Sequence, residues 1–150
     1  MKDITKKLVD LLRSGYCTPQ IAKLAKKLKE PSSTIHYNIK KLENENVVKN
    51  YKAIFNHKFI GEGFCVFVLL NLSPEEYGDP DRIAKDLSKY DEIESINIIT
   101  GDWEILLKVR LKDQEEYYNF IKNVISRKGI TKIKSLTSLK EKKSEFYIID

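Results

Sequence analysis

Hydroxyl, imidazole, phenol and ammonium groups are concentrated between residues 23 and 41, where together they suit contact with a polyanion. Hydroxyls can hydrogen-bond phosphate oxygens or base edges, and histidine or tyrosine can contact a base edge. Lysine ammonium groups neutralise phosphates and release counterions. The side chains expected to make such contacts are Ser32, Ser33, Thr34, His36, Tyr37, Lys40 and Lys41, with Lys23, Lys26 and Lys27.

The sequence offers no comparable set of catalytic or metal-binding residues. Its two histidines are His36 and His57, and no Ser/His/Asp order, CxxC, HExxH or phosphate-binding glycine loop is present. Cys17 and Cys65 have no nearby ligand partners, and we expect free thiols rather than a disulfide. The sequence therefore argues against an enzyme and predicts neither a metal nor a cofactor.

Net positive charge is confined to the N-terminal third of the chain. Residues 1–52 contain twelve Lys or Arg against five Asp or Glu, a net charge of +7, within a chain of net charge +5. Residues 53–150 contain fifteen against seventeen, a net charge of −2. This asymmetry indicates a polyanionic partner for the first region alone. A lysine-rich face that only keeps the protein soluble is the alternative.

Three predicted helices fill the first 46 residues and would position the polar side chains. The first ends at Ser14–Gly15, the second begins at Thr18–Pro19, and Ser32 or Ser33 caps the third, which ends near Asn46. The residues predicted to be buried are Ile4, Leu8, Leu11 and Leu12, then Ile21, Leu24, Ala25 and Leu28, and finally Ile35, Ile39 and Leu42.

The second and third helices have the lengths and the short turn of a helix-turn-helix, in which the later helix enters the DNA major groove. A three-helix packing module with a solvated lysine face is the alternative, and His36 can equally be an exposed histidine without a role.

From Val47 the apolar pattern has a period of two, which predicts a strand over residues 47–54 and then a linker up to Gly63. The predicted strand 64–72 is apolar on both faces, and we assign one face to helices of its own domain and the other to a second subunit.

Further along, a helix begins at Asp79–Pro80, strands cover residues 93–100 and 103–111, Asp113 caps a helix, and a strand covers residues 130–139. Residues 146–149 are predicted to add a short edge strand. In the strand 103–111, Glu104, Lys108 and Arg110 are expected to face outward.

The order β-α-β-β-α-β is that of a ferredoxin-like fold. We therefore predict an α+β chain with three parts. A three-helix, winged helix-turn-helix domain covers residues 1–50, a strand and linker cover 51–63, and a ferredoxin-like domain covers 64–150.

Three segments of the chain resemble a known family: IAKLAKKLKEPSSTIHYNIKKLENENVVKNYKAI, IESINIITGDWEILLKV and GITKIKSLTSLKEKK. The family is Lrp/AsnC, the feast/famine transcription regulators, and the resemblance covers essentially the whole chain. It implies a helix-turn-helix that binds double-stranded DNA and a C-terminal domain that pairs subunits into homodimers, which can assemble into octamers. It also implies an amino acid or related metabolite as a small-molecule effector.

The effector contacts that the resemblance implies are Thr100, Gly101, Asp102 and Glu104, with Ser135 and Thr137 across an interface between dimers. A turn can offer backbone N–H groups to a carboxylate, and acidic side chains can hold an ammonium group. A plain hairpin turn at Gly101–Asp102 is the alternative.

The resulting hypothesis is a sequence-specific, DNA-binding transcription regulator of the cytoplasm. The first ten residues lack the apolar stretch of a secretory signal, and no apolar run approaches the ~18 residues that span a bilayer. A DNA-packaging protein with little sequence preference and a stand-alone metabolite-sensing module are the alternatives.

Overall fold

The computed structural model describes residues 3–75, 79–144 and 147–148, and the chain folds into two compact units. The first unit ends at Phe55 and the second begins at Asn56. In the described residues, no helix has the length and apolar character needed to span a lipid bilayer.

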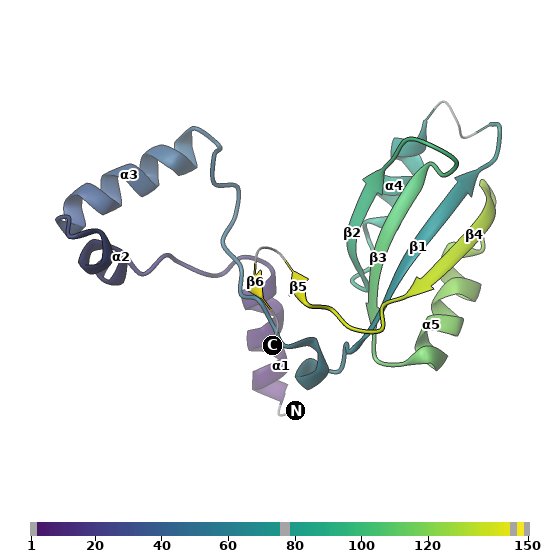
Figure 1. Ribbon diagram of the computed structural model, residues 1–150, viewed down its shortest axis with the longest axis horizontal. Helices are drawn as coiled ribbons and strands as arrows, with labels where there is room; N and C mark the ends of the chain where they lie inside the picture. Colours follow the sequence, from purple (N-terminus) through teal and green to yellow (C-terminus); the bar gives the residue numbers. More distant parts are fainter. Residues whose placement is uncertain (1–2, 76–78, 145–146, 149–150) are drawn as a thin grey trace. The chain divides into compact units, whose positions relative to one another are not determined.

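Three helices make up the regular structure of the first unit. They are α1 Asp3–Arg13, α2 Ile21–Leu28 and α3 Ser32–Asn44 (Figure 1). Gly15 follows α1 with a φ of +105°, and a Cβ there would lie 2.3 Å from Oδ1 of Asn50, so glycine is required. The chain turns between α2 and α3 at Lys29, with a φ of 57°. Asn46 has a φ of 56°, the left-handed conformation that is common just after the end of a helix, and α3 ends near it as predicted.

The predicted starts of α2 and α3 are wrong. The N-cap position of α2 is held by Gln20, so the helix does not begin at Thr18–Pro19. The N-cap position of α3 is held by Pro31, so neither Ser32 nor Ser33 is the N-cap. Neither observed N-cap side chain makes a capping hydrogen bond. The proline ring fixes φ at −59° and favours the extended backbone from which a helix can start.

The strand predicted over residues 47–54 is also wrong, because residues 47–56 form neither helix nor strand. A strand needs a neighbouring strand to pair its backbone N–H and C=O groups. The N–H of Ala53 donates instead to the carbonyl oxygen of Leu12 at 3.3 Å, and the N–H of Tyr51 donates to Oδ1 of Asn50 at 2.8 Å. These two groups are paired outside any strand ladder, and the described part of the first unit has no wing strand.

The predicted core of the first unit is buried only in part. Ala25 and Ile35 are buried. The apolar side chains that were expected inside but remain exposed are Ile4, Leu8, Leu11, Leu12, Leu24, Leu28 and Leu42. Exposed apolar surface of this extent is typical of a region that another protein surface covers.

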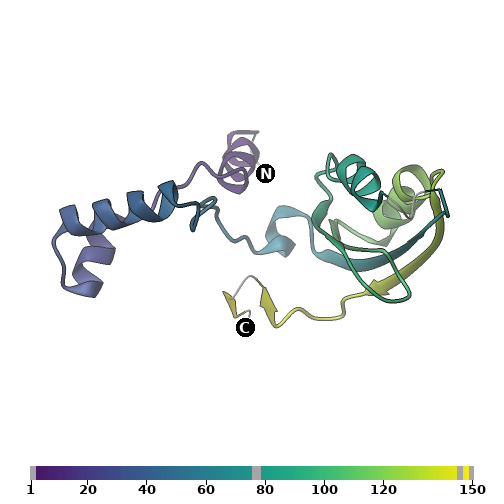
Figure 2. The same ribbon diagram turned by 90° about the horizontal axis from the view of Figure 1, so that it is seen from above.

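The second unit is built on a four-stranded antiparallel sheet in the spatial order β2-β3-β1-β4. Its elements in chain order are η1 His57–Ile60, β1 Phe64–Leu72, α4 Pro80–Leu87, β2 Ile93–Ile98, β3 Ile105–Leu111, α5 Gln114–Phe120, the π-helical turn η2 Ile121–Ile125 and β4 Ile130–Thr137. Figure 2 shows α4 and α5 on the same face of the sheet. The order β-α-β-β-α-β is confirmed, and with it the ferredoxin-like fold.

Both helices of this unit begin at the predicted aspartates. Oδ1 of Asp79 accepts a hydrogen bond from the N–H of Arg82 at 3.2 Å, and Oδ1 of Asp113 accepts one from the N–H of Glu116 at 3.0 Å. Each carboxylate satisfies a backbone N–H that the first helical turn leaves without a partner, and its negative charge suits the positive end of the helix dipole.

The helix-covered face of the sheet carries the core. The alternation predicted for β3 is confirmed, because Ile105, Leu107 and Val109 are fully buried against Val66, Val68, Leu70 and Leu72 of β1 and the apolar sides of α4 and α5. The opposite face, called the open face below, carries Phe67 and Leu69 of β1, which are half-buried.

Lys108 and Arg110 face away from the core, as predicted, but they are not exposed to solvent. Only 13% of the Lys108 side chain and 7% of the Arg110 side chain are exposed. Both project on the open face, as the period of two requires, but Glu94 and Glu141 pair with them there.

A short hairpin follows β4 in the chain. The strand ends at Thr137 rather than Leu139, and β5 Lys143–Ser144 pairs with β6 Tyr147–Ile148. Residues 146 and 149 of the predicted edge strand lie outside the described residues.

Candidate nucleic-acid interface and effector loop

Helix α3 presents a continuous polar surface. All ten side chains predicted to contact nucleic acid are exposed, seven of them at the start or on the outer side of α3 and three on α2: Ser32, Ser33, Thr34, His36, Tyr37, Lys40 and Lys41, with Lys23, Lys26 and Lys27. Tyr37 is 69% exposed, so its ring is accessible to a partner. Ile35, on the inner side, is buried and fixes which side of α3 faces outward.

The two lysines of α3 have carboxylate neighbours on the same helix. Nζ of Lys40 lies 2.7 Å from Oε2 of Glu43, and Nζ of Lys41 lies 3.9 Å from Oε1 of Glu45. The hydroxyl of Tyr51 donates to the other oxygen of Glu43 at 3.2 Å. The hydrogen bond from Lys40 lowers the pKa of Glu43, and the same bond raises the pKa of Lys40. Both groups are therefore charged at neutral pH, and Glu43 competes with a phosphate for Lys40.

The loop between β2 and β3, residues 99–104, holds four of the predicted effector contacts and is called the effector loop below. Thr100, Gly101 and Asp102 are exposed, and Gly101 has a φ of +110° that favours glycine. The N–H of Ile99 donates to the carbonyl oxygen of Glu104 at 2.9 Å and closes the loop.

Glu104 is half-buried and bonds to the end of β1. Its Oε2 accepts from the backbone N–H of Leu72 at 2.9 Å and from Nδ2 of Asn71 at 3.1 Å. Nδ2 of Asn71 also donates to the carbonyl oxygen of Asp102 at 2.5 Å. Sequence reasoning missed Asn71, although a polar residue that interrupts the apolar run of β1 was an available signal.

Ser135 and Thr137 lie on β4, apart from the effector loop of the same chain. The register pairs them with Val68 and Val66 of β1, whereas the end of β3 next to the loop is level with Leu70. Oγ of Ser135 makes a short hydrogen bond with the hydroxyl of Tyr117 on α5. Burial raises the pKa of that tyrosine more than the bond to Ser135 lowers it. The structure thus brings Thr100, Gly101, Asp102 and Glu104 together and leaves Ser135 and Thr137 separate.

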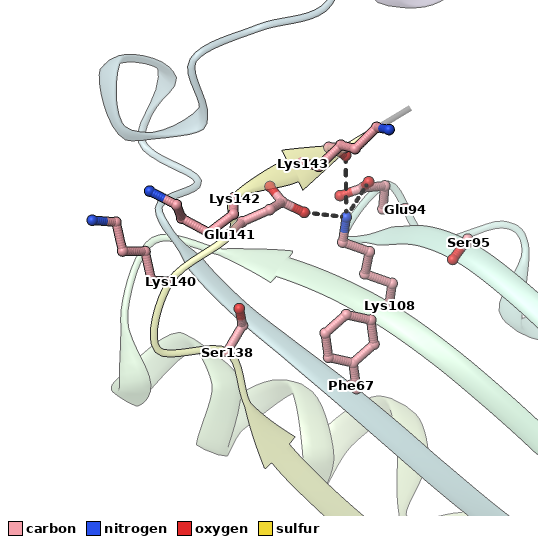
Figure 3. Close-up of a pocket in the computed structure, with 10 residues that line it drawn as sticks. Phe67, Glu94, Ser95, Lys108, Ser138, Lys140, Glu141, Lys142 and Lys143 are labelled. Atoms are coloured by element: carbon pink, nitrogen blue, oxygen red, sulfur yellow. Dashed lines mark hydrogen bonds and ion pairs between the residues drawn. The ribbon is translucent and has the colours of Figure 1, made fainter. Parts of the chain in front are cut away.

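A cluster of four charges lies on the open face of the sheet, and sequence reasoning missed it. Nζ of Lys108 lies 2.9 Å from Oε1 of Glu94 and 2.6 Å from Oε1 of Glu141, as Figure 3 shows. Arg110 bonds the second oxygen of each carboxylate, with 2.6 Å between Nη2 and Oε2 of Glu141. The cluster ties the segment after β4 to β2 and β3.

Burial raises the pKa of Glu94 and of Glu141, but hydrogen bonds from Lys108 and Arg110 outweigh it, so both pKa values end below the ordinary value. Burial also raises the pKa of the Cys65 thiol, which neighbours Arg110 in the register.

The cluster borders a groove of about 510 Å³ on the open face. The groove is lined by Phe67, Glu94, Ser95, Lys108, Ser138, Lys140, Glu141, Lys142, Lys143 and Ser144. The charges of the cluster neutralise one another. The remaining charge at the groove comes from three exposed lysines, Lys140, Lys142 and Lys143.

Among the residues that the structure describes, no group of three or more His, Cys, Asp or Glu side chains could hold a metal ion. Cys17 and Cys65 are free thiols, the latter buried.

The fold and these surfaces define a class of protein, one with a helix-turn-helix unit followed by a ferredoxin-like unit. Residues 65–148 match the family model described as the Lrp/AsnC ligand binding domain. The chain belongs to the Lrp/AsnC family of transcription regulators, as the sequence resemblance predicted.

Two curated relatives extend over nearly the whole chain. The HTH-type transcriptional regulator FL11 of Pyrococcus furiosus is 31% identical, with 93% of this chain and 90% of that protein covered. The regulator of the same name from Pyrococcus horikoshii is 29% identical, with 95% and 92% covered.

Solved structures share the fold over both units. An AsnC family transcriptional regulator from Agrobacterium tumefaciens superposes with a TM-score of 0.76 at 23% identity, with 100% of this chain and 95% of that chain covered. The transcriptional regulator NMB0573 of Neisseria meningitidis, solved as a complex with L-Met, also has a TM-score of 0.76 at 23% identity, with 96% and 92% covered.

Proposed function

We propose that the protein is a sequence-specific DNA-binding transcription regulator, acting in the cytoplasm, whose second unit pairs subunits and binds an amino acid or a related metabolite. The observation that carries the proposal is the exposed polar side of α3, which belongs to a unit whose first 52 residues have a net charge of +7. A DNA-packaging protein and a stand-alone metabolite sensor are the alternative classes, and the gel shifts described below distinguish them.

In this proposal α3 lies in the major groove of double-stranded DNA. The hydroxyls of Ser32, Ser33 and Thr34 lie at the N-terminal end of a thirteen-residue helix, where backbone N–H groups and the helix dipole favour phosphate. His36 and Tyr37 follow and meet base edges, including thymine methyl groups.

The lysines of α2 and α3 then neutralise phosphates on either side of the groove. These are Lys23, Lys26, Lys27, Lys40 and Lys41. Their contacts supply affinity that falls with added salt and do not depend on the base sequence.

Pairing of two subunits is proposed to use the open face of the sheet. This face carries Phe67, Leu69 and Leu106, all half-buried, and Leu136, which is 46% exposed. A second copy would cover these side chains in a symmetric contact. Dimers would then associate further into an octamer, and the exposed apolar residues of the first unit provide additional surface for association.

The effector is proposed to bind at the effector loop, between Thr100, Gly101, Asp102 and Glu104 of one dimer and Ser135 and Thr137 of another. The Neisseria relative is described as a complex with L-Met, which supports an amino acid as the class of ligand. The exposed loop offers backbone N–H groups for a carboxylate, and Glu104 offers a negative charge for an ammonium group.

The test is a set of gel shifts with the full-length protein and the promoter region of its own gene, repeated with each proteinogenic amino acid. We expect a salt-sensitive complex on a pseudo-palindromic site whose half-sites are about 10 bp apart, or a multiple of that. Equal affinity for all duplexes would favour a packaging protein. No binding to any duplex would favour a stand-alone sensor.

A further inference from the structure

One side chain, Asn71, connects the end of β1 to both sides of the effector loop. The two N–H groups on its Nδ2 match two acceptors of the loop, the carbonyl oxygen of Asp102 at 2.5 Å and Oε2 of Glu104 at 3.1 Å. An amide nitrogen carries two hydrogens, so both are used. Asn71 thus joins two loop positions that are not neighbours in sequence.

The same contacts set the orientation of the Glu104 carboxylate. Oε2 accepts from Asn71 and from the backbone N–H of Leu72, and the N–H of Glu104 donates to the carbonyl oxygen of Leu70 at 3.1 Å. Oε1 accepts no hydrogen bond from the residues that the structure describes. One oxygen is therefore held by the chain, and the other remains available to a ligand.

The end of β1 that carries Asn71 is itself fixed from the other side. The pairing of β1 with β4 shifts register between Asn71 and Leu72, the mark of a β-bulge. The hydroxyl of Thr131, at the bulge, donates to the carbonyl oxygen of Asn71 at 3.3 Å. A residue anchored at both its backbone and its side chain can hold the loop with little loss of conformational entropy on binding.

We propose that Asn71 is the positioning residue of the effector site. It holds the effector loop against β1 and orients Glu104 so that Oε1 receives the ammonium group of an α-amino acid, while exposed N–H groups of the loop receive its carboxylate. This inference rests on the proposed effector site. It assigns a role to a residue that does not touch the ligand.

The test replaces Asn71 with aspartate, a change that keeps the shape of the side chain. The substitution replaces the two N–H donors by a carboxylate oxygen. That oxygen would repel the carbonyl oxygen of Asp102 and the carboxylate of Glu104. The matched control is Asn123→Asp, which makes the same change at an exposed residue of η2. Both variants are made in the full-length protein.

Two measurements are made on each variant. The first is amide hydrogen exchange in ligand-free protein at Ile99 and Glu104, whose N–H groups are hydrogen-bonded at the two ends of the effector loop, and there we expect Asn71→Asp to exchange at least about tenfold faster than wild type. The second is calorimetric titration with L-methionine and then the other proteinogenic amino acids, where we expect the Kd to rise at least about tenfold. Asn123→Asp should stay within about twofold of wild type in both.

A double variant separates positioning from simple stability. In Asn71→Asp with Glu104→Gln, donor and acceptor exchange places, so the side-chain hydrogen bond can form again. We expect loop exchange to return towards the wild-type rate while amino acid binding stays weak, because the charge that holds the ammonium group is gone. Recovery of the loop exchange would show that the bond between residues 71 and 104 holds the loop.

Equal loop exchange in Asn71→Asp and Asn123→Asp would overturn the inference, as would a lower Tm for Asn71→Asp with unchanged loop exchange and unchanged Kd. If wild-type protein binds no amino acid, the proposed effector function fails, together with the role given to Oε1. Loop exchange then still decides, without any ligand, whether Asn71 positions the effector loop.

Discussion

Replacing Glu43 with glutamine should strengthen DNA binding and make it more sensitive to salt. In the free protein, Nζ of Lys40 lies 2.7 Å from Oε2 of Glu43, and both side chains are solvent-accessible. Glu43 therefore competes with a phosphate for the charge of Lys40. The glutamine keeps an amide oxygen for the hydroxyl of Tyr51 but removes the charge that competes for Lys40.

The expected magnitude follows from counting phosphate contacts. Because Glu43 and the phosphate share Lys40 in the wild-type complex, Glu43→Gln adds at most one neutralised phosphate, so the slope of log K against log salt becomes steeper by up to about 0.9 and binding tighter by up to about eightfold at 0.1 M salt and fourfold at 0.2 M. The change should be the same for a specific and a non-specific duplex, because phosphates carry no sequence information.

Fluorescence anisotropy with a labelled duplex, repeated across a salt series, measures both affinity and slope. Asp10→Asn is the matched control, since it adds the same net charge to the first unit on α1, which carries none of the predicted DNA contacts. A Glu43→Gln slope equal to that of Asp10→Asn would refute the reasoning that Glu43 restrains Lys40.

Three further predictions concern other parts of the molecule. Tyr37→Ala should reduce the preference for the specific duplex, whereas Lys40→Ala should weaken all duplexes alike, as competition binding would show; a uniform loss of affinity in both variants would contradict the base contact. Gly101→Ala and Gly61→Ala both place a Cβ in open space at positive φ, so each should lower stability by about 1–2 kcal/mol in thermal unfolding, but only the first should weaken amino acid binding. Glu141→Gln should lower the free energy of unfolding at pH 7 by about 1–2 kcal/mol and make the acid-induced loss shallower. The lowered pKa of this carboxylate stabilises the fold above the ordinary value of 4.5 and ceases to do so as pH falls through the folded-state pKa, so an unchanged acid titration would contradict the pairing.

The sequence predicted the second unit well because its signals are local and strong. The alternation in β3 identified Ile105, Leu107 and Val109 as core, and Asp79 and Asp113 marked two helix starts where aspartate supplies an acceptor for unpaired N–H groups.

Where the sequence misled, the deciding partner lay far along the chain or was absent. Lys108 and Arg110 alternate like solvent-facing residues, and nothing near them reveals that Glu141 will bond both. The strand over 47–54 has a suitable pattern but no neighbouring strand, and a pattern cannot supply one.

The candidate site was predicted only in part for the same reason. The polar side of α3 follows from helical periodicity once Ile35 is placed inside. For Asn71 the only signal is a polar residue within an apolar strand, and its role depends on hydrogen bonds to residues 31 and 33 positions away.

The central claim is that α3 reads base sequence in the major groove, and competition anisotropy at 0.15 M salt tests it most directly. A duplex selected from the protein's own promoter region is competed with a scrambled duplex of the same length and composition. The account predicts that the selected duplex binds at least about 10³-fold more tightly. A ratio near one would contradict it.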